Sequence, residues 1–215
     1  MPTNLLANNT KVTTLSLAFY GTAFTTANIT LAHMPNLTST SEMFANCGYL
    51  TSVNHDIIKN NPQLRSVDAM FVNCANLKYL FIDENGIKNS FDIFPASHYI
   101  SNIKGMFFNC SKLHIASKDG IKVFFDSLGT GRKASSITQL NAQGVFYNCF
   151  KGGDSDDIDA STLTSLPDGV FSKCSHLTNI SYAFARTGIV SLPANSLFLE
   201  ANEIGPYLVT DNVKF

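Results

Sequence analysis

A short pattern of apolar and polar residues recurs along the chain, and its clearest copies contain the cysteines. All five cysteines end a pentapeptide in which an apolar residue is followed by phenylalanine. These pentapeptides span residues 43–47, 70–74, 106–110, 145–149 and 170–174, so the steps between their phenylalanines are 27, 36, 39 and 25 residues. Self-similarity at such a period is the sequence signature of a repeat architecture.

Weaker copies of the frame fall midway between the strong ones, anchored for example at Leu31, Ile58 and Phe94. Two half-units therefore make one repeat, and the stronger copies add a leucine three residues after the cysteine. No single repeat can bury its apolar side alone, so the repeats are expected to stack on one another. Equivalent apolar positions of successive repeats then form a column along the stack. We predict a repeat core of Phe44, Cys47, Leu50, Phe71, Cys74, Leu77, Phe107, Cys110, Phe146, Cys149, Phe171, Cys174, Leu177 and Phe184.

The frame predicts two local elements. Met43, Phe44 and Cys47 have the spacing of one face of a helical turn, so we expect a one-turn helix there. The segments that follow, such as residues 50–53 and 177–180, are rich in Ser, Thr and β-branched residues and favour short strands. The fold class predicted from these elements is a single repeat solenoid over residues 1–215, with about six to seven coils.

The rhythm breaks in two places. About ten extra residues follow Phe71, most simply as a loop around residues 83–86. Residues 111–145 carry the frame only faintly, and we interpret them as a decorated or degenerate coil. There, residues 118–128 predict an amphipathic helix with Asp119 near its start, followed by a flexible loop at 129–136.

Two residue types in the frame have a predicted role. A thiol fits where a small apolar group is needed, so we expect all five cysteines to be reduced and to lie in one buried column. An asparagine precedes four of them and is expected to hydrogen-bond neighbouring backbone at the turn, and asparagine also tolerates left-handed backbone geometry. These asparagines are Asn46, Asn73, Asn109 and Asn148.

Residues 163–198 resemble the BspA-type leucine-rich repeats of bacterial surface proteins, and a similar MF-x-x-C-x-x-L pattern occurs in repeats of mycoplasma lipoproteins. The resemblance covers nearly the whole chain and is specific for the repeat class. It implies a right-handed leucine-rich-repeat solenoid used for adhesion or protein binding, often as one segment of a longer surface protein. Comparable repeats also occur in proteins of gut bacteria and their phages.

Composition and charge narrow the range of partners. Fifteen Lys and Arg stand against sixteen Asp and Glu, and this balance argues against nucleic acid or an anionic membrane as partner. No run of 18 or more apolar residues exists, so we expect no membrane insertion. The first residues lack the basic and apolar stretches of a secretion signal.

Candidate chemistry is sparse, and we predict no enzyme, cofactor or metal. No Cys/His set has zinc spacing. The acidic loop 152–159 has calcium-type carboxylates but breaks the EF-hand pattern, which favours a solvated turn. The glycine loop 129–133 follows a helix and lacks a GK(S/T) ending, which argues against a phosphate site. The five histidines are scattered along the chain: His33, His55, His98, His114 and His176.

Two functions fit this reading. The first is an adhesion-type module that binds a protein or glycan, extracellular or at the cell surface within a longer chain. The alternative is a structural or receptor-binding subunit of a larger assembly, such as a phage fibre or virion decoration protein. The terminal repeats carry no polar capping helix, so neighbouring subunits or further repeats are expected to cover the ends. Exposed aromatic residues outside the frame are candidate contacts: Tyr20, Tyr49, Tyr99 and Tyr182.

Overall fold

The computed structural model describes residues 5–6, 8–54, 56–80, 92–95, 98–114, 118–130, 139–150 and 163–192. Several predictions concern other residues and lie outside this part of the chain. They are the loop at 83–86, the acidic loop 152–159, the loop beyond Thr130, His55, and the chain before Leu5 and after Leu192.

Five short strands pair in parallel. β1 (Thr26–Ala27), β2 (Ser52–Val53) and β3 (Tyr79–Leu80) form a three-stranded sheet. β4 (Leu140–Asn141) and β5 (Leu177–Asn179) form a second sheet of two strands, with an irregularity after Leu140. The strands predicted at 50–53 and 177–180 are therefore present, as β2 and β5.

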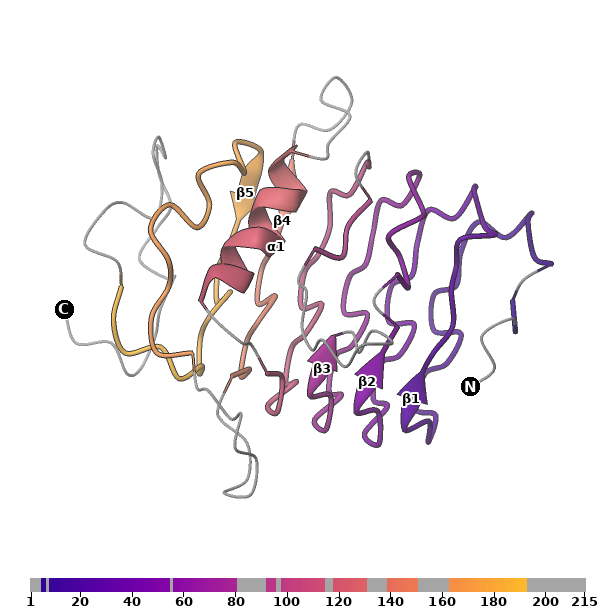
Figure 1. Cartoon of the computed structure of the whole chain (residues 1–215), viewed down its shortest axis with the longest axis horizontal. Coiled ribbons are helices and arrows are strands. Elements are labelled where there is room, and N and C mark those ends of the chain that lie inside the picture. The colour runs from indigo at the N-terminus through magenta and orange to yellow at the C-terminus, as the bar shows by residue number, and fades with distance from the viewer. Residues whose placement is uncertain are drawn as a thin grey trace.

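Isolated parallel bridges form a further line of contact along the molecule. They connect Thr14, Ser39, Ser66, Asn102 and Asn141 in that order. The chain thus returns to equivalent positions along one axis, and in Figure 1 successive segments lie side by side from the indigo to the orange part of the chain.

Each bridge residue opens a nine-residue segment whose sixth residue is phenylalanine, here called a Phe turn. Within the described residues there are six, numbered in chain order: 14–22, 39–47, 66–74, 102–110, 141–149 and 179–187. The predicted one-turn helix is wrong, because only alternate N–H groups bond within the turn, each from residue i to i−3. In Phe turn 2, for instance, Ala45 N–H donates to Glu42 C=O at 3.0 Å and Cys47 N–H donates to Phe44 C=O at 3.2 Å.

Left-handed residues two before and two after each phenylalanine explain why no helix forms. In Phe turn 2 these are Glu42 (φ 55°) and Asn46 (φ 59°), and in Phe turn 4 Gly105 (φ 57°) and Asn109 (φ 62°). Their reversed geometry turns alternate N–H groups out of the segment, toward the next Phe turn. The backbone is therefore satisfied partly within a turn and partly between turns.

A second apolar row lies across the core from the Phe turns. It contains Leu31, Ile58, Phe94, Phe125 and Phe171, all of them buried. Its links repeat those of the Phe turns: Asn61 Nδ2 donates to Leu31 C=O at 2.8 Å, and Cys174 Sγ donates to Phe125 C=O at 2.9 Å. We call these residues the opposite row.

The helix α1 (Asp119–Thr130) supplies Phe125 to the opposite row. It matches the predicted helix at 118–128 and extends two residues further, into the segment expected to be loop. Its buried side chains share one face at helical spacing, as the apolar stripe of a helix packed on a core does. They are Ile121, Phe124, Phe125 and Leu128.

Three predicted core residues are placed differently from the prediction. Phe171 and Cys174 lie in the opposite row, half a repeat out of phase with the Phe turns, because they pack on Phe125 of α1. Leu177 is only partly buried, since β5 pairs with β4 alone among the described strands. The other predicted core residues are buried.

Candidate functional site

The Phe turns hold a continuous column of phenylalanine rings. Neighbouring ring centroids lie 5.4, 5.7, 5.5, 5.5 and 5.7 Å apart, with interplanar angles of 20°, 3°, 4°, 5° and 23°. Offset stacking at this separation is favourable beyond the area that the rings bury. The column therefore fixes the register between turns. Its members are Phe19, Phe44, Phe71, Phe107, Phe146 and Phe184.

All five cysteines are buried thiols, but four of them, not five, share one column. Cys47, Cys74, Cys110 and Cys149 each donate through Sγ to the phenylalanine carbonyl of the preceding Phe turn, at 2.9 to 3.1 Å. Burial raises the pKa of Cys110 and Cys149. A protonated, buried thiol is a poor nucleophile and metal ligand, so Cys110 and Cys149 are part of the scaffold.

An amide ladder runs along the outer side of the Phe turns. Asn73 Nδ2 donates to Asn46 Oδ1 at 2.8 Å, Asn109 Nδ2 to Asn73 Oδ1 at 2.8 Å, and Asn148 Nδ2 to Asn109 Oδ1 at 3.0 Å. All four asparagines adopt the left-handed geometry that this residue type tolerates, with φ between 58° and 62°. The predicted side-chain bonds to backbone are wrong, because the stacked turns bring each amide against the amide of the next turn.

The first residue of every Phe turn caps the backbone two residues later, a regularity that the sequence analysis missed. A side-chain oxygen accepts from that N–H at 3.0 to 3.3 Å in all six Phe turns of the described chain. The signal was available, because Thr, Ser or Asn occurs five residues before each phenylalanine of the column, as Thr14, Ser39, Ser66, Asn102, Asn141 and Asn179.

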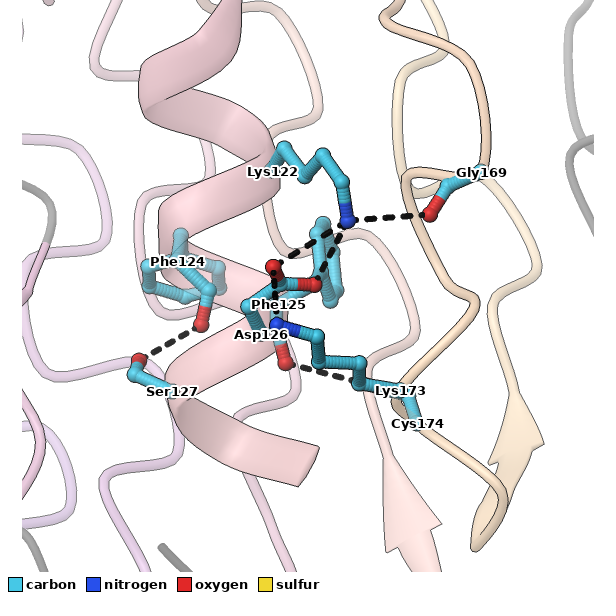
Figure 2. Close-up of polar contacts among 8 residues, drawn as sticks. All are labelled: Lys122, Phe124, Phe125, Asp126, Ser127, Gly169, Lys173 and Cys174. Atoms are coloured by element: carbon cyan, nitrogen blue, oxygen red, sulfur yellow. Dashed lines mark hydrogen bonds and ion pairs between the residues drawn. The ribbon is translucent and has the colours of Figure 1, made fainter. Parts of the chain in front are cut away.

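Ionic contacts fix α1 against the segment around Lys173, as Figure 2 shows. Asp126 accepts from Lys122 at 2.9 Å and from Lys173 at 3.1 Å, and Lys122 Nζ also reaches Gly169 C=O at 3.5 Å. Gly129 is required at the end of the helix, because a Cβ atom there would collide with the carbonyl oxygen of Lys173. This side of the molecule is a packed joint between the helix and its neighbour.

Partly exposed aromatic and cationic side chains come together on Phe turns 4 to 6. Phe108 and Tyr147 stack with ring centroids 4.3 Å apart and an interplanar angle of 5°. Arg186 Cζ lies 5.7 Å from the centroid of Tyr147, within cation–π range. We call Phe108, Tyr147 and Arg186 the aromatic strip.

The backbone positions the aromatic strip rigidly. Phe108 and Tyr147 directly follow column phenylalanines, and Arg186 takes the place in its turn that Asn148 has in the preceding one. Gly144 beside the Phe108 ring has φ 60°, a left-handed conformation that glycine adopts without strain. Sequence reasoning missed the strip, although aligning the frame on Phe107, Phe146 and Phe184 places its residues next to one another.

The exposed tyrosines that the sequence proposed as contacts do not form one surface. Tyr20 is 51% exposed in Phe turn 1, Tyr49 is 67% exposed after Phe turn 2, and Tyr182 is 44% exposed in Phe turn 6. Tyr99 is half-buried, with Arg65 Cζ 5.1 Å above its ring. These residues are spread along the whole stack.

Metal and membrane sites were also sought in the part of the chain that the structure describes. There, no three His, Cys, Asp or Glu side chains come together as a metal site. None of its helices combines the length and apolar character needed to cross a bilayer. The described histidines stay apart, and His98 is buried with its Nδ1 accepting from Ile100 N–H at 3.1 Å.

Comparison with known proteins gives no relative. No family model matches the chain, and searches of curated proteins and of solved structures found no similar protein.

Proposed function

We propose that the chain is a leucine-rich-repeat-type solenoid and that it works as a non-enzymatic binding module for a protein or glycan. The observation that carries this proposal is the aromatic strip, where Phe108, Tyr147 and Arg186 are held partly exposed on consecutive turns. Aromatic residues and arginine are enriched in recognition surfaces and supply a large share of their binding energy.

The contrast between inner and outer positions of the turns supports the same proposal. The phenylalanine is the same in all six described Phe turns, and cysteine follows three residues later in four of them. The position after the phenylalanine changes from turn to turn, holding Tyr20, Ala45, Val72, Phe108, Tyr147 and Ala185. The two alanines are buried, whereas the larger side chains at this position are at least partly exposed. A constant core beside varied, partly exposed side chains suits a repeat protein that uses its side for binding.

The test is a binding screen in which wild-type protein is compared with a Tyr147→Ser, Arg186→Ser double variant. Labelled proteins are applied to a glycan microarray and to a panel of purified surface proteins. We expect at least one ligand whose affinity falls about tenfold or more in the double variant, equivalent to about 1.4 kcal/mol.

A matched control removes one exposed aromatic and one exposed cation elsewhere, as Tyr49→Ser with Lys11→Ser. Circular dichroism and thermal unfolding establish that both double variants remain folded. The proposal fails if no ligand is found, or if every ligand binds both double variants equally well.

The location that goes with this function is extracellular or at a cell surface, within a longer chain.

A second candidate function, as a subunit of a larger assembly such as a virion, is favoured by a separate observation. The first Phe turn leaves a row of backbone carbonyls without hydrogen-bond donors within the described residues.

A further inference from the structure

The amide ladder and the aromatic strip follow neighbouring lines along the stack. The four ladder asparagines take the eighth position of Phe turns 2 to 5, and Arg186 takes that position in Phe turn 6. Phe108 and Tyr147 take the seventh position of Phe turns 4 and 5, so each directly precedes a ladder asparagine. One outer line of the molecule therefore carries four amides in succession, followed by a guanidinium group in the next turn.

The bonds within the ladder use only part of each amide. In Asn73 and Asn109, one N–H donates to the preceding asparagine and one lone pair accepts from the next, which leaves one N–H and one lone pair. These remaining groups form no hydrogen bond within the described residues. Asn46 and Asn73 are exposed, and Asn109 and Asn148 are half-buried. The ladder therefore offers a donor and an acceptor on one amide, the pair that two adjacent hydroxyl groups of a sugar match.

The repeat distance of the ladder suits a polysaccharide better than a peptide. Column rings of consecutive Phe turns lie 5.4 to 5.7 Å apart, so the ladder amides recur at nearly this step. Side chains on one face of an extended peptide repeat at about 6.7 Å, so a peptide falls out of step with the amides within a few turns. One pyranose unit of an extended β-linked glycan is close in length to one turn of the stack, so successive sugars meet successive amides.

The aromatic strip adds a preference for negative charge. Phe108 stacks on the Tyr147 ring with centroids 4.3 Å apart, and the Arg186 guanidinium, from the next turn, lies 5.7 Å from the same ring. The faces of Tyr147 are thus occupied within the stack, and its exposed part is the ring edge, which carries partial positive charge. Arg186 is exposed and pairs with no carboxylate of the described residues. A ligand carboxylate can therefore accept two guanidinium N–H groups in a bidentate pair.

We propose that the ligand of the binding module is a linear glycan with carboxylate groups. It lies along the stack, with its hydroxyl groups on the amide ladder and a carboxylate on Arg186. This inference rests on the proposed binding function and names the ligand class of the same surface. The amides are neutral and provide contact turn after turn, whereas Arg186 provides the charge that selects an acidic sugar. Loss of an amide therefore weakens the binding of any glycan on this line, and loss of Arg186 weakens only the binding of an acidic one.

Isothermal titration calorimetry with β-linked hexamannuronate tests the proposal, and the neutral β-linked hexamer of mannose is the counterpart without carboxylates. We expect wild-type protein to bind the acidic hexamer about tenfold more tightly, a difference of about 1.4 kcal/mol. Arg186→Gln should lower the affinity for the acidic hexamer to that for the neutral one, which stays unchanged. Asn73→Gly suits the left-handed backbone at φ 61° and should weaken both hexamers about threefold to tenfold, as the loss of a hydrogen bond does.

The chain offers a matched control for each variant. Arg65→Gln is the control for the charge, because Arg65 is also an exposed arginine above a tyrosine ring, with its Cζ 5.1 Å from the centroid of Tyr99. Asn28→Gly is the control for the amide, since Asn28 is exposed and accepts from Asn54 Nδ2 outside the amide ladder. Neither control should change either affinity. Thermal unfolding establishes that all four variants are folded at the temperature of the titration.

Three results would overturn the proposal: no binding of the acidic hexamer, equal affinity for both hexamers, or losses in Arg186→Gln and Asn73→Gly no larger than in their controls. A hexaglutamate peptide that binds more tightly than hexamannuronate, in an Arg186-dependent way, would also overturn it, because the ligand would then be an acidic protein segment. The proposed binding function survives each of these results if the binding screen finds another ligand that depends on Tyr147 and Arg186. The failure of this inference is therefore distinguishable from the failure of that function.

Discussion

Phe turns 2 and 3 follow each other after 27 residues, whereas Phe turns 5 and 6 are separated by 38, yet the two pairs are joined by the same contacts. Phe44 N–H donates to Met70 C=O at 2.9 Å, and Phe146 N–H donates to Ala183 C=O at 2.9 Å. The ring centroids are 5.7 Å apart in both pairs. The Phe-turn side of the molecule therefore keeps its register whatever length of chain lies between the turns.

The opposite row differs between the same two regions. Near Phe turns 2 and 3 it is built from short turns around Leu31 and Ile58, linked by the Asn61 amide. Near Phe turns 5 and 6 it contains α1 and Phe171, with the Phe125 and Phe171 rings 4.6 Å apart at 72°. Neighbouring segments of the opposite row are linked through side chains such as those of Asn61 and Cys174. A helix can therefore replace a turn in this row without breaking a ladder of backbone hydrogen bonds.

The largest expected effect comes from Phe107→Ala in the ring column. Phe107 is buried and stacks between Phe71 and Phe146, so removing the ring destabilises the fold by about 3–5 kcal/mol. Urea unfolding followed by circular dichroism measures the loss. Phe19→Ala is the comparison, since Phe19 is only partly buried at the end of the column, and an equal loss from both variants would contradict the assigned stack.

Gly129→Ala tests the joint that is special to the helical region. The added Cβ atom meets the Lys173 carbonyl, so α1 must shift and lose its packing, at a cost of about 1–3 kcal/mol as for other overpacked sites. Gly48→Ala is the matched control, because nothing lies within 4 Å of a Cβ atom there. Hydrogen exchange should show faster opening of residues 119–130 in Gly129→Ala, and unchanged exchange would show that α1 is not held at this point.

Asn109 lies in the amide ladder where the regular region meets the helical region. Asn109→Ala and Asn109→Gly separate the contribution of its amide hydrogen bonds from that of its left-handed backbone geometry. Alanine is strained at φ 62° by about 1–2 kcal/mol and also removes two amide hydrogen bonds. Glycine removes the bonds but not the favourable backbone geometry, so it should cost less, about 0.5–1.5 kcal/mol. Thermal unfolding of both variants is the measurement, and equal stability of the two would mean that backbone strain plays no part.

The smallest expected effect is electrostatic and lies in Phe turn 3. Burial raises the pKa of Asp68 above 3.8, the neighbouring Glu42 raises it further, and Lys104 opposes the shift. A raised carboxyl pKa stabilises the folded protein fully below pH 3.8, and this contribution is lost as pH rises through the folded pKa. Asp68→Asn should therefore melt slightly higher than wild type at pH 7, with the difference vanishing at low pH. A lower melting temperature at pH 7 would show that the ionised Asp68 is stabilising.

Much of this arrangement could be predicted from the sequence. The Phe-x2-Cys frame predicted the buried positions and the segments that became β2 and β5, and the amphipathic pattern of residues 118–128 predicted α1, because apolar periodicity reports burial directly. It did not predict the left-handed residues at Glu42 and Ala69 or the amide ladder. Those features depend on N–H groups and amides meeting the next turn, which local propensity does not encode.

The sequence by itself determined which positions of each frame copy are buried, the phenylalanine above all. Only the tertiary structure decided which side of the stack each copy occupies. Residues 145–149 and 170–174 have nearly the same pattern, yet Phe146 lies in the ring column and Phe171 in the opposite row. The physical reason is that both sides of the core bury an apolar turn equally well. Packing against α1 and the neighbouring turns, not the local pattern, therefore selects the side.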